Sequence, residues 1–107
     1  MSDIKEERMK EIIRQKASEF LERESSGNAL LTVTSVKLIE RGTKAVISFT
    51  VFPATSENGA LDFAKRKRSY FRDFLKKETK LFRLPFIDFQ IDLGEKNRQK
   101  IDSLSQL

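Results

Sequence analysis

Neither cysteine nor histidine occurs in this chain of 107 residues, and tryptophan is absent as well. Without cysteine the protein has no disulfides, thiolate metal ligands or cysteine nucleophiles. Without histidine it lacks the commonest general base and, together with the missing thiolates, most ligands for transition metals. Triads of serine, histidine and aspartate and HExxH zinc sites are therefore excluded. We expect a protein that is not an enzyme and that needs no cofactor and no metal.

Long apolar runs are missing too, because no stretch approaches the ~18 apolar residues of a membrane span. The first residues, MSDIKEERMK, contain no apolar core of a secretory signal. With 38% hydrophobic and 35% charged residues, the composition is that of a folded domain. Because no secretory signal is visible, we expect it in the cytoplasm without membrane contact. We expect residues 1–94 to form this single domain. Residues 95–107 form a polar tail, in which Ile101, Leu104 and Leu107 allow either a short helix or a frayed end.

Charge is distributed unevenly along the chain, whose net charge is +5. Residues 61–83 hold nine bases and three acids, a local charge of +6, so the other 84 residues sum to -1. A basic block on an otherwise neutral domain is typical of a protein that contacts phosphates.

The hydrophobic pattern predicts a hairpin of two strands after an N-terminal helix. Residues 3–23 carry apolar side chains at helical spacing. Residues 31–38 and 45–52 alternate as strands, joined by a turn in which Gly42 supplies the positive φ. In the first strand the alternation of apolar and polar residues shifts by one position midway. A bulge near Thr34 and Ser35 would keep the apolar side chains of both halves on the same face of the sheet.

The second half of the chain predicts two helices and a third strand. Residues 53–59 have a loop composition, and residues 60–80 return to helical spacing. The apolar stripe is interrupted at Lys67, Arg68 and Ser69, which indicates two helices that meet at a kink. Ile87, Phe89 and Ile91 alternate as a third strand whose direction the pattern leaves open. The expected class is α+β, with helices on one face of a three-stranded sheet.

This order of elements matches a KH-like domain related to type II, a nucleic-acid module that usually grips the backbone with a GxxG loop. The glycines are Gly27, Gly42, Gly59 and Gly94, so the chain has no GxxG loop. The runs Leu31-Thr32-Val33-Thr34-Ser35-Val36-Lys37-Leu38, Phe71-Arg72-Asp73-Phe74-Leu75 and Lys80-Leu81-Phe82-Arg83-Leu84-Pro85-Phe86-Ile87 then carry a more specific resemblance. In order, spacing and length, nearly the whole chain resembles the ribosome-binding factor A family.

The resemblance implies a ribosome assembly factor with a helix-kink-helix in place of the GxxG loop. Such a factor binds the immature small (30S) ribosomal subunit, assists late maturation of 16S rRNA and leaves before translation. Its partners would be the small subunit and its rRNA, with no small-molecule substrate, and we expect a monomer. The family usually has Ala-any-Gly at the kink, whereas this chain has Lys67, Arg68 and Ser69.

The basic segment predicts the RNA-binding site. On a helix, Lys65, Arg68, Arg72 and Lys76 would form one stripe able to follow a phosphate backbone, with Ser69 beside it. The expected RNA-binding residues are Lys65, Arg66, Lys67, Arg68, Ser69, Arg72, Lys76, Lys80 and Arg83. Lys37, Arg41 and Lys44 around the hairpin would extend this basic surface.

Other interpretations stay open. The basic helix could instead bind an acidic protein partner, which would make the chain a protein-interaction domain of the same shape. A magnesium-dependent nuclease would use Asp88 and Asp92, which fall on one face of the third strand. Among the aromatic residues, Phe20, Phe49, Phe71, Phe74 and Phe89 are expected in the core, whereas Phe52, Phe82 and Phe86 fall on the polar side or in a loop.

Overall fold

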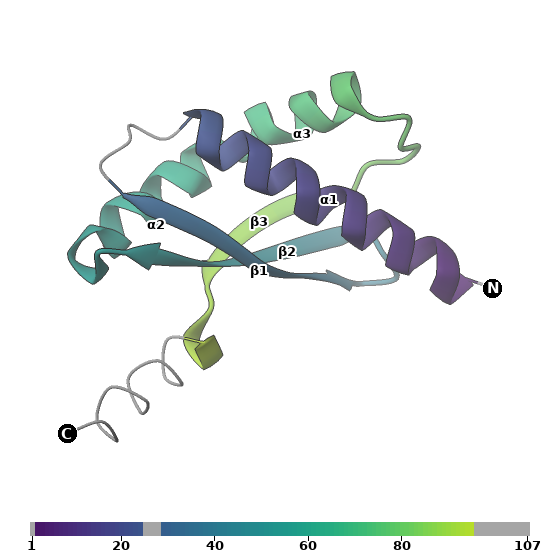
Figure 1. The fold of residues 1–107 in the computed structure, drawn as a ribbon. Coiled ribbons are helices and arrows are strands. Elements are labelled where there is room, and N and C mark those ends of the chain that lie inside the picture. The colour runs from purple at the N-terminus through teal and green to yellow at the C-terminus, as the bar shows by residue number, and fades with distance from the viewer. Residues whose placement is uncertain (1, 25–28, 96–107) are drawn as a thin grey trace.

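A computed structural model of the chain describes residues 2–24 and 29–95 and confirms the α+β class (Figure 1). Helix α1 (Ser2–Glu24) precedes the hairpin, and helices α2 and α3 connect the hairpin to the last strand. In order, the elements are α1 (Ser2–Glu24), β1 (Leu30–Ile39), β2 (Lys44–Phe52), the 3-10 turn η1 (Ala54–Ser56), α2 (Glu57–Arg66), α3 (Arg68–Glu78) and β3 (Phe86–Ile91). The short helix expected in the tail falls mainly on residues 96–107, which lie outside the described residues.

The three strands form one mixed sheet in the order β1-β2-β3. Strand β1 is antiparallel to β2, and β3 is parallel to β2, which settles the direction that the sequence left open. The expected bulge is confirmed, because the register of β1 shifts between Val33 and Ser35. It keeps Val33 buried and still lets Val36 and Leu38 pack against the same core.

One core joins the helices to a single face of the sheet. Helix α1 contributes Ile13 and Ala17, and α2 contributes Ala60 and Ala64. Phe71 on α3 is fully buried, with its ring centroid 5.3 Å from that of Phe20 and 5.8 Å from that of Phe89. The buried side chains of the sheet are Val33, Ala45, Ile47, Phe49, Ile87 and Phe89. Every helix therefore holds a defined position relative to β3, the strand nearest the basic segment.

The expected kink is a one-residue break at Lys67. Its backbone has φ -95° and ψ 8°, and its amide donates to the carbonyls of Phe63 and Ala64, both at 3.1 Å. Because φ is negative, the position accepts a Cβ without a steric penalty, and no glycine is needed. A lysine can therefore form the break where small residues are usual in the family that the sequence resembles.

Two local expectations were wrong or incomplete. Residues 53–59 are not all loop, because η1 and the start of α2 lie there, with Glu57 placed favourably in the first helical turn. In the hairpin turn Gly42 has the expected positive φ of 81°, but Glu40 and Arg41 are left-handed as well, at 53° and 58°.

Candidate nucleic-acid interface

The two bases beside the helix break contact β3. Lys65, near the end of α2, places Nζ 3.2 Å from Oδ1 of Asp88, and Arg68, at the start of α3, places Nη1 3.3 Å from the same oxygen. Arg68 also donates from Nε to the carbonyl of Lys65 at 2.9 Å. These contacts attach the end of α2 and the start of α3 to one carboxylate of β3.

The surroundings of Asp88 favour its charged form. Burial raises the pKa of this carboxyl, but hydrogen bonds from Lys65 and the Phe89 amide, with the charges of Lys65 and Arg68, lower it more. The net result is a pKa below the usual value, so Asp88 is ionised at neutral pH and partly neutralises the two bases.

Arg72 connects α3 to the loop before β3. Its guanidinium donates from Nε to the carbonyl of Pro85 at 3.2 Å and from Nη2 to the carbonyl of Leu84 at 3.1 Å. It also lies over the ring of Phe86, 5.8 Å from the centroid. Arg72 therefore has a structural role that the sequence did not indicate.

These contacts show how the four bases of the expected stripe are engaged in the structure. Lys65, Arg68 and Arg72 are all engaged with β3 or with the loop before it, and only Lys76 of the stripe projects from α3 with no ion pair or hydrogen bond found among the described residues. The stripe spans two helices, because the break at Lys67 separates Lys65 on α2 from the other three bases on α3. Spacing alone also could not place β3 and its acid beside these bases.

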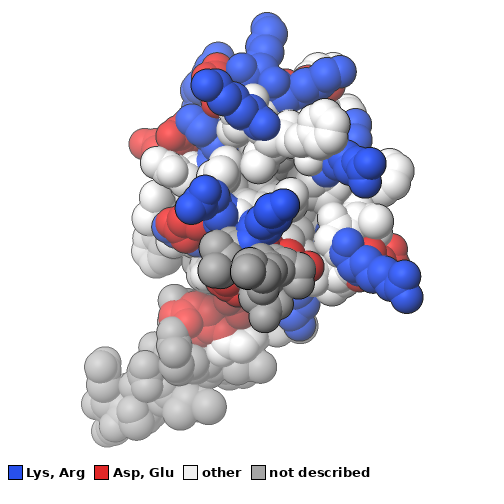
Figure 2. All heavy atoms as spheres, turned by 90° about the vertical axis from the view of Figure 1, so that its right-hand side faces the viewer, with Lys and Arg blue, Asp and Glu red and all other residues white. Residues whose placement is uncertain are grey.

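Other predicted site residues face solvent. Arg66, Lys80 and Arg83 are exposed together with Lys76, and Ser69 is exposed beside the break. Lys67 is half-buried, and its ammonium lies over the ring of Tyr70 at 4.7 Å. Figure 2 shows Lys and Arg side chains gathered on the end of the molecule that carries the loop after α3, the hairpin turn and the start of α1.

A groove of about 460 Å³ brings several of these residues together between α3 and β3. It is lined by Lys44, Arg68, Ser69, Arg72, Phe86, Ile87 and Asp88. Lys44 arrives from β2 because it pairs with Phe86 in the parallel register. The sequence marked Lys44 only as an extension of the basic surface, since the direction of β3 was unknown. The groove combines cations, a hydroxyl and an aromatic ring, which suits a phosphodiester chain.

The carboxylates of the nuclease alternative have other partners. Asp92 accepts from Thr34 Oγ1 at 2.5 Å and from the Glu95 amide at 3.0 Å, while Asp88 binds the bases described above. Within residues 2–24 and 29–95, no group of three acidic side chains is placed to hold a metal ion. The geometry therefore gives no support to a magnesium site at these two residues. In the same ranges, no helix is long and apolar enough to cross a membrane.

Comparison with known sequences decides the family. The sequence model of the family described as "Ribosome-binding factor A" matches residues 5–105, nearly the whole chain. The chain belongs to the ribosome-binding factor A family. Its partner is therefore the ribosome, as the sequence resemblance predicted. Comparison with curated protein sequences finds no significant match.

Solved structures share the fold of this ribosome-binding factor A family member. Ribosome-binding factor A from Thermus thermophilus is similar with a TM-score of 0.69 and 22% identity, over 78% of this chain and 91% of the other. A Thermotoga maritima protein provisionally described as ribosome-binding factor A gives a TM-score of 0.59 and 17% identity, over 82% and 83% of the two chains. These similarities show that the chain has the fold of these two proteins, and the expected KH-like arrangement is consistent with it.

Proposed function

We propose that the chain is a non-enzymatic assembly factor that binds the immature 30S subunit through its rRNA. It assists late maturation of 16S rRNA in the cytoplasm and acts as a monomer. The observation that carries this proposal is the basic surface of α2, α3 and the following loop, held in place by Asp88 and Arg72 on a chain of a ribosome-binding family.

The exposed bases are suited to phosphate contacts. Arg66, Lys76, Lys80 and Arg83 are exposed on α2, on α3 and in the loop after α3. Contacts of this kind position a protein on RNA and carry little sequence information, so specificity would come from the shape of the rRNA and from neighbouring ribosomal proteins. If about five bases each neutralise a phosphate of single-stranded RNA, the logarithm of the affinity falls with the logarithm of the salt concentration with a slope of roughly -3 to -4.

The helix break replaces the missing GxxG loop in this proposal. A GxxG loop lets the RNA backbone approach main-chain amides, whereas the amide of Lys67 is already bound to the carbonyls of Phe63 and Ala64. The amide of Lys67 is therefore not available to RNA, and in this proposal side chains make the contacts at the break. Ser69 and the basic residues around it are the groups available on that surface.

Single charge reversals test the surface. We expect Lys76→Glu and Lys80→Glu each to weaken binding to purified small subunits several-fold, because each removes a cation and adds a repulsive charge. Lys37→Glu is the matched control, since it makes the same charge change on an exposed residue of β1. The sequence pattern assigns Lys37 to the extended basic surface, but its neighbours Val36 and Leu38 pack against the core, so Lys37 lies on the face of the sheet away from the helices. Equal weakening by all three variants would contradict a localised site.

Maturation itself is tested in cells that lack the protein. We expect precursors of 16S rRNA to accumulate there, and expression of the parent or Lys37→Glu to restore processing while Lys76→Glu and Lys80→Glu restore it less. Normal 16S rRNA processing without the protein would contradict the proposed role in maturation. Binding that survives removal of the rRNA but requires an acidic ribosomal protein would favour the protein-interaction alternative.

A further inference from the structure

A second groove lies at the basic end of the molecule, next to the groove described above. It has a volume of about 670 Å³, between the start of α1, the hairpin turn and the loop that leads into β3. Met9 and Leu38 contribute apolar surface, and Phe82 and Phe86 contribute aromatic rings. This volume falls within the ~300–1,000 Å³ of sites that hold small organic groups.

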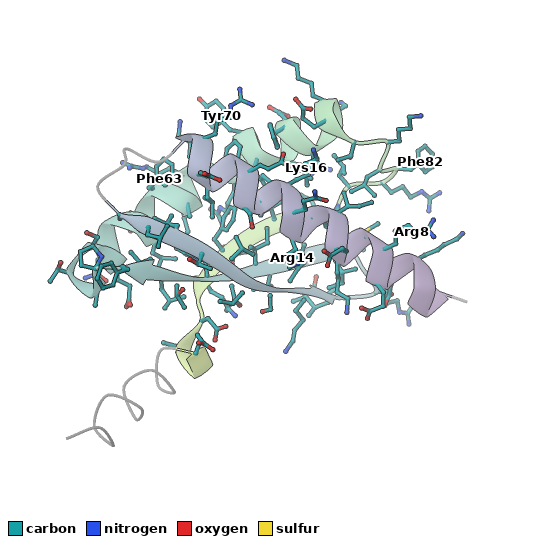
Figure 3. All side chains as sticks on the ribbon, viewed as in Figure 1. Arg8, Arg14, Lys16, Phe63, Tyr70 and Phe82 are labelled. Atoms are coloured by element: carbon teal, nitrogen blue, oxygen red, sulfur yellow. The ribbon has the colours of Figure 1, made fainter. Side chains whose placement is uncertain are left out.

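The two aromatic rings of this groove are exposed to an unusual degree. Phe82 is 82% and Phe86 72% exposed, although most other phenylalanines of the chain lie buried or half-buried on the core side. Figure 3 shows Phe82 projecting from the loop after α3, at the same end of the molecule as Arg8 on α1. Exposed aromatic side chains that share one hollow indicate a binding surface rather than a packing role.

Positive charge surrounds the rings. Lys5, Arg41 and Arg83 line the groove, against one acid, Glu6. Arg41 and Arg83 also share a left-handed backbone, with φ of 58° and 57°. Such conformations are costly for arginine and tend to occur where function requires a particular side chain. The loops thus present two guanidinium groups at one hollow despite this cost.

We propose that this groove takes an unpaired nucleobase of rRNA, which stacks on Phe82 or Phe86 while its flanking phosphates contact Arg41 and Arg83. Flat aromatic faces beside cations are the arrangement by which proteins bind single-stranded RNA. The position of Phe86 supports RNA as the occupant, because Phe86 lines both grooves and carries Arg72 over its ring. An RNA strand in the groove between α3 and β3 would reach the second groove directly. The proposal rests on the proposed function and adds base stacking to its phosphate contacts.

Conservative variants test the stacking. Phe82→Leu and Phe86→Leu keep apolar bulk and remove the aromatic face, and neither ring is part of the core. Phe52→Leu is the matched control, since Phe52 is 73% exposed at the opposite end of β2. Binding is measured to purified small subunits and to single-stranded RNA oligonucleotides of 16S rRNA sequence that carry a fluorescent adenine analogue, which is quenched on stacking. Circular dichroism of each variant confirms the fold.

We expect Phe82→Leu or Phe86→Leu to weaken binding roughly 5- to 100-fold and to reduce the quenching, with an unchanged salt slope because no charge is altered. Phe52→Leu should match the parent. Parental affinity and quenching in both test variants, with weakened binding by Lys80→Glu, would overturn the stacking and leave the proposed function intact. A parent that binds no small subunit would overturn the proposed function itself. Loss of subunit binding with parental binding to the oligonucleotides would overturn stacking in favour of a ribosomal protein contact.

Discussion

The ammonium group of Lys65 on α2 lies 3.2 Å from the carboxylate of Asp88 on β3. This ion pair crosses from the helices to the sheet, and Arg68 on α3 binds the same oxygen. One acid therefore organises two of the bases expected to meet RNA. A phosphate that binds either base must compete with this carboxylate, which makes Asp88 a negative determinant of affinity as well as a brace for the helix break.

Removal of the charge of Asp88 should strengthen RNA binding while it weakens the fold. We expect Asp88→Asn to raise affinity for small-subunit rRNA a few-fold and to make the salt slope steeper, because Lys65 and Arg68 become available for phosphates. The free energy of unfolding should fall by at most about 1 kcal/mol, since all three side chains are partly exposed. Salt-dependent binding and denaturant titration measure the two effects.

Asp73→Asn is the control for that variant. Asp73 is an exposed acid of α3, so the substitution makes the same change in net charge without releasing Lys65 or Arg68. An equal gain in affinity from both variants would show that only net charge matters and that the brace has no effect on binding.

The stability contributed by Asp88 should depend on pH. Its pKa in the folded protein is lowered, so its contribution is complete above the unfolded value of about 4 and is lost as pH falls through the lower folded value. We expect the difference in unfolding free energy between the parent and Asp88→Asn to be constant near neutral pH and to shrink below about pH 4. A difference that grows with acidification would contradict the assigned ion pairs.

Arg72 should stabilise the loop before β3 in a way that lysine cannot replace. Its planar guanidinium donates hydrogen bonds to two successive carbonyls, whereas a lysine ammonium would not reach both carbonyls with good geometry from the same position. We expect Arg72→Lys to lower the free energy of unfolding by about 1–2 kcal/mol, although the charge is kept. Lys76→Arg, on the next turn of α3, is a control without such partners. Parental stability of Arg72→Lys in chemical denaturation would disprove the role in holding the loop.

The left-handed backbone at Arg83 predicts that two substitutions there differ in their effect on stability. Asparagine tolerates this conformation, so Arg83→Asn should keep parental stability while it weakens RNA binding through loss of a cation. Arg83→Val should lose about 1 kcal/mol or more, because a β-branched side chain is poorly accommodated there. Thermal unfolding separates the two, and equal melting temperatures would contradict the backbone assignment.

The fold followed closely from local patterns in the sequence. The shift in the alternation of apolar residues along β1 predicted the bulge at Thr34, and the gap in the apolar stripe predicted the helix break at Lys67. Both features are local, because each depends on how a few neighbouring residues divide between buried and exposed faces. The class of the domain could therefore be predicted before any tertiary contact was known.

The arrangement of the candidate site depended on contacts between distant segments. Asp88 lies 23 residues from Lys65 in sequence, and its contact requires β3 to run parallel to β2, which periodicity does not specify. The left-handed backbone of Arg41 and Arg83 also gives no signal in composition, since neither position is a glycine or asparagine. The basic segment could thus be recognised from the sequence. Which of its bases contact β3 and which are exposed to solvent could not be predicted.

Sedimentation of the tagged protein in cell extract through gradients at low and high salt tests binding to the small subunit most directly. We expect the protein to migrate with free small subunits at low salt, to leave them at high salt and to be absent from translating ribosomes. Lys80→Glu should leave the subunits at a lower salt concentration than Lys37→Glu. A protein that stays at the top of the gradient at every salt concentration would contradict binding to the small subunit.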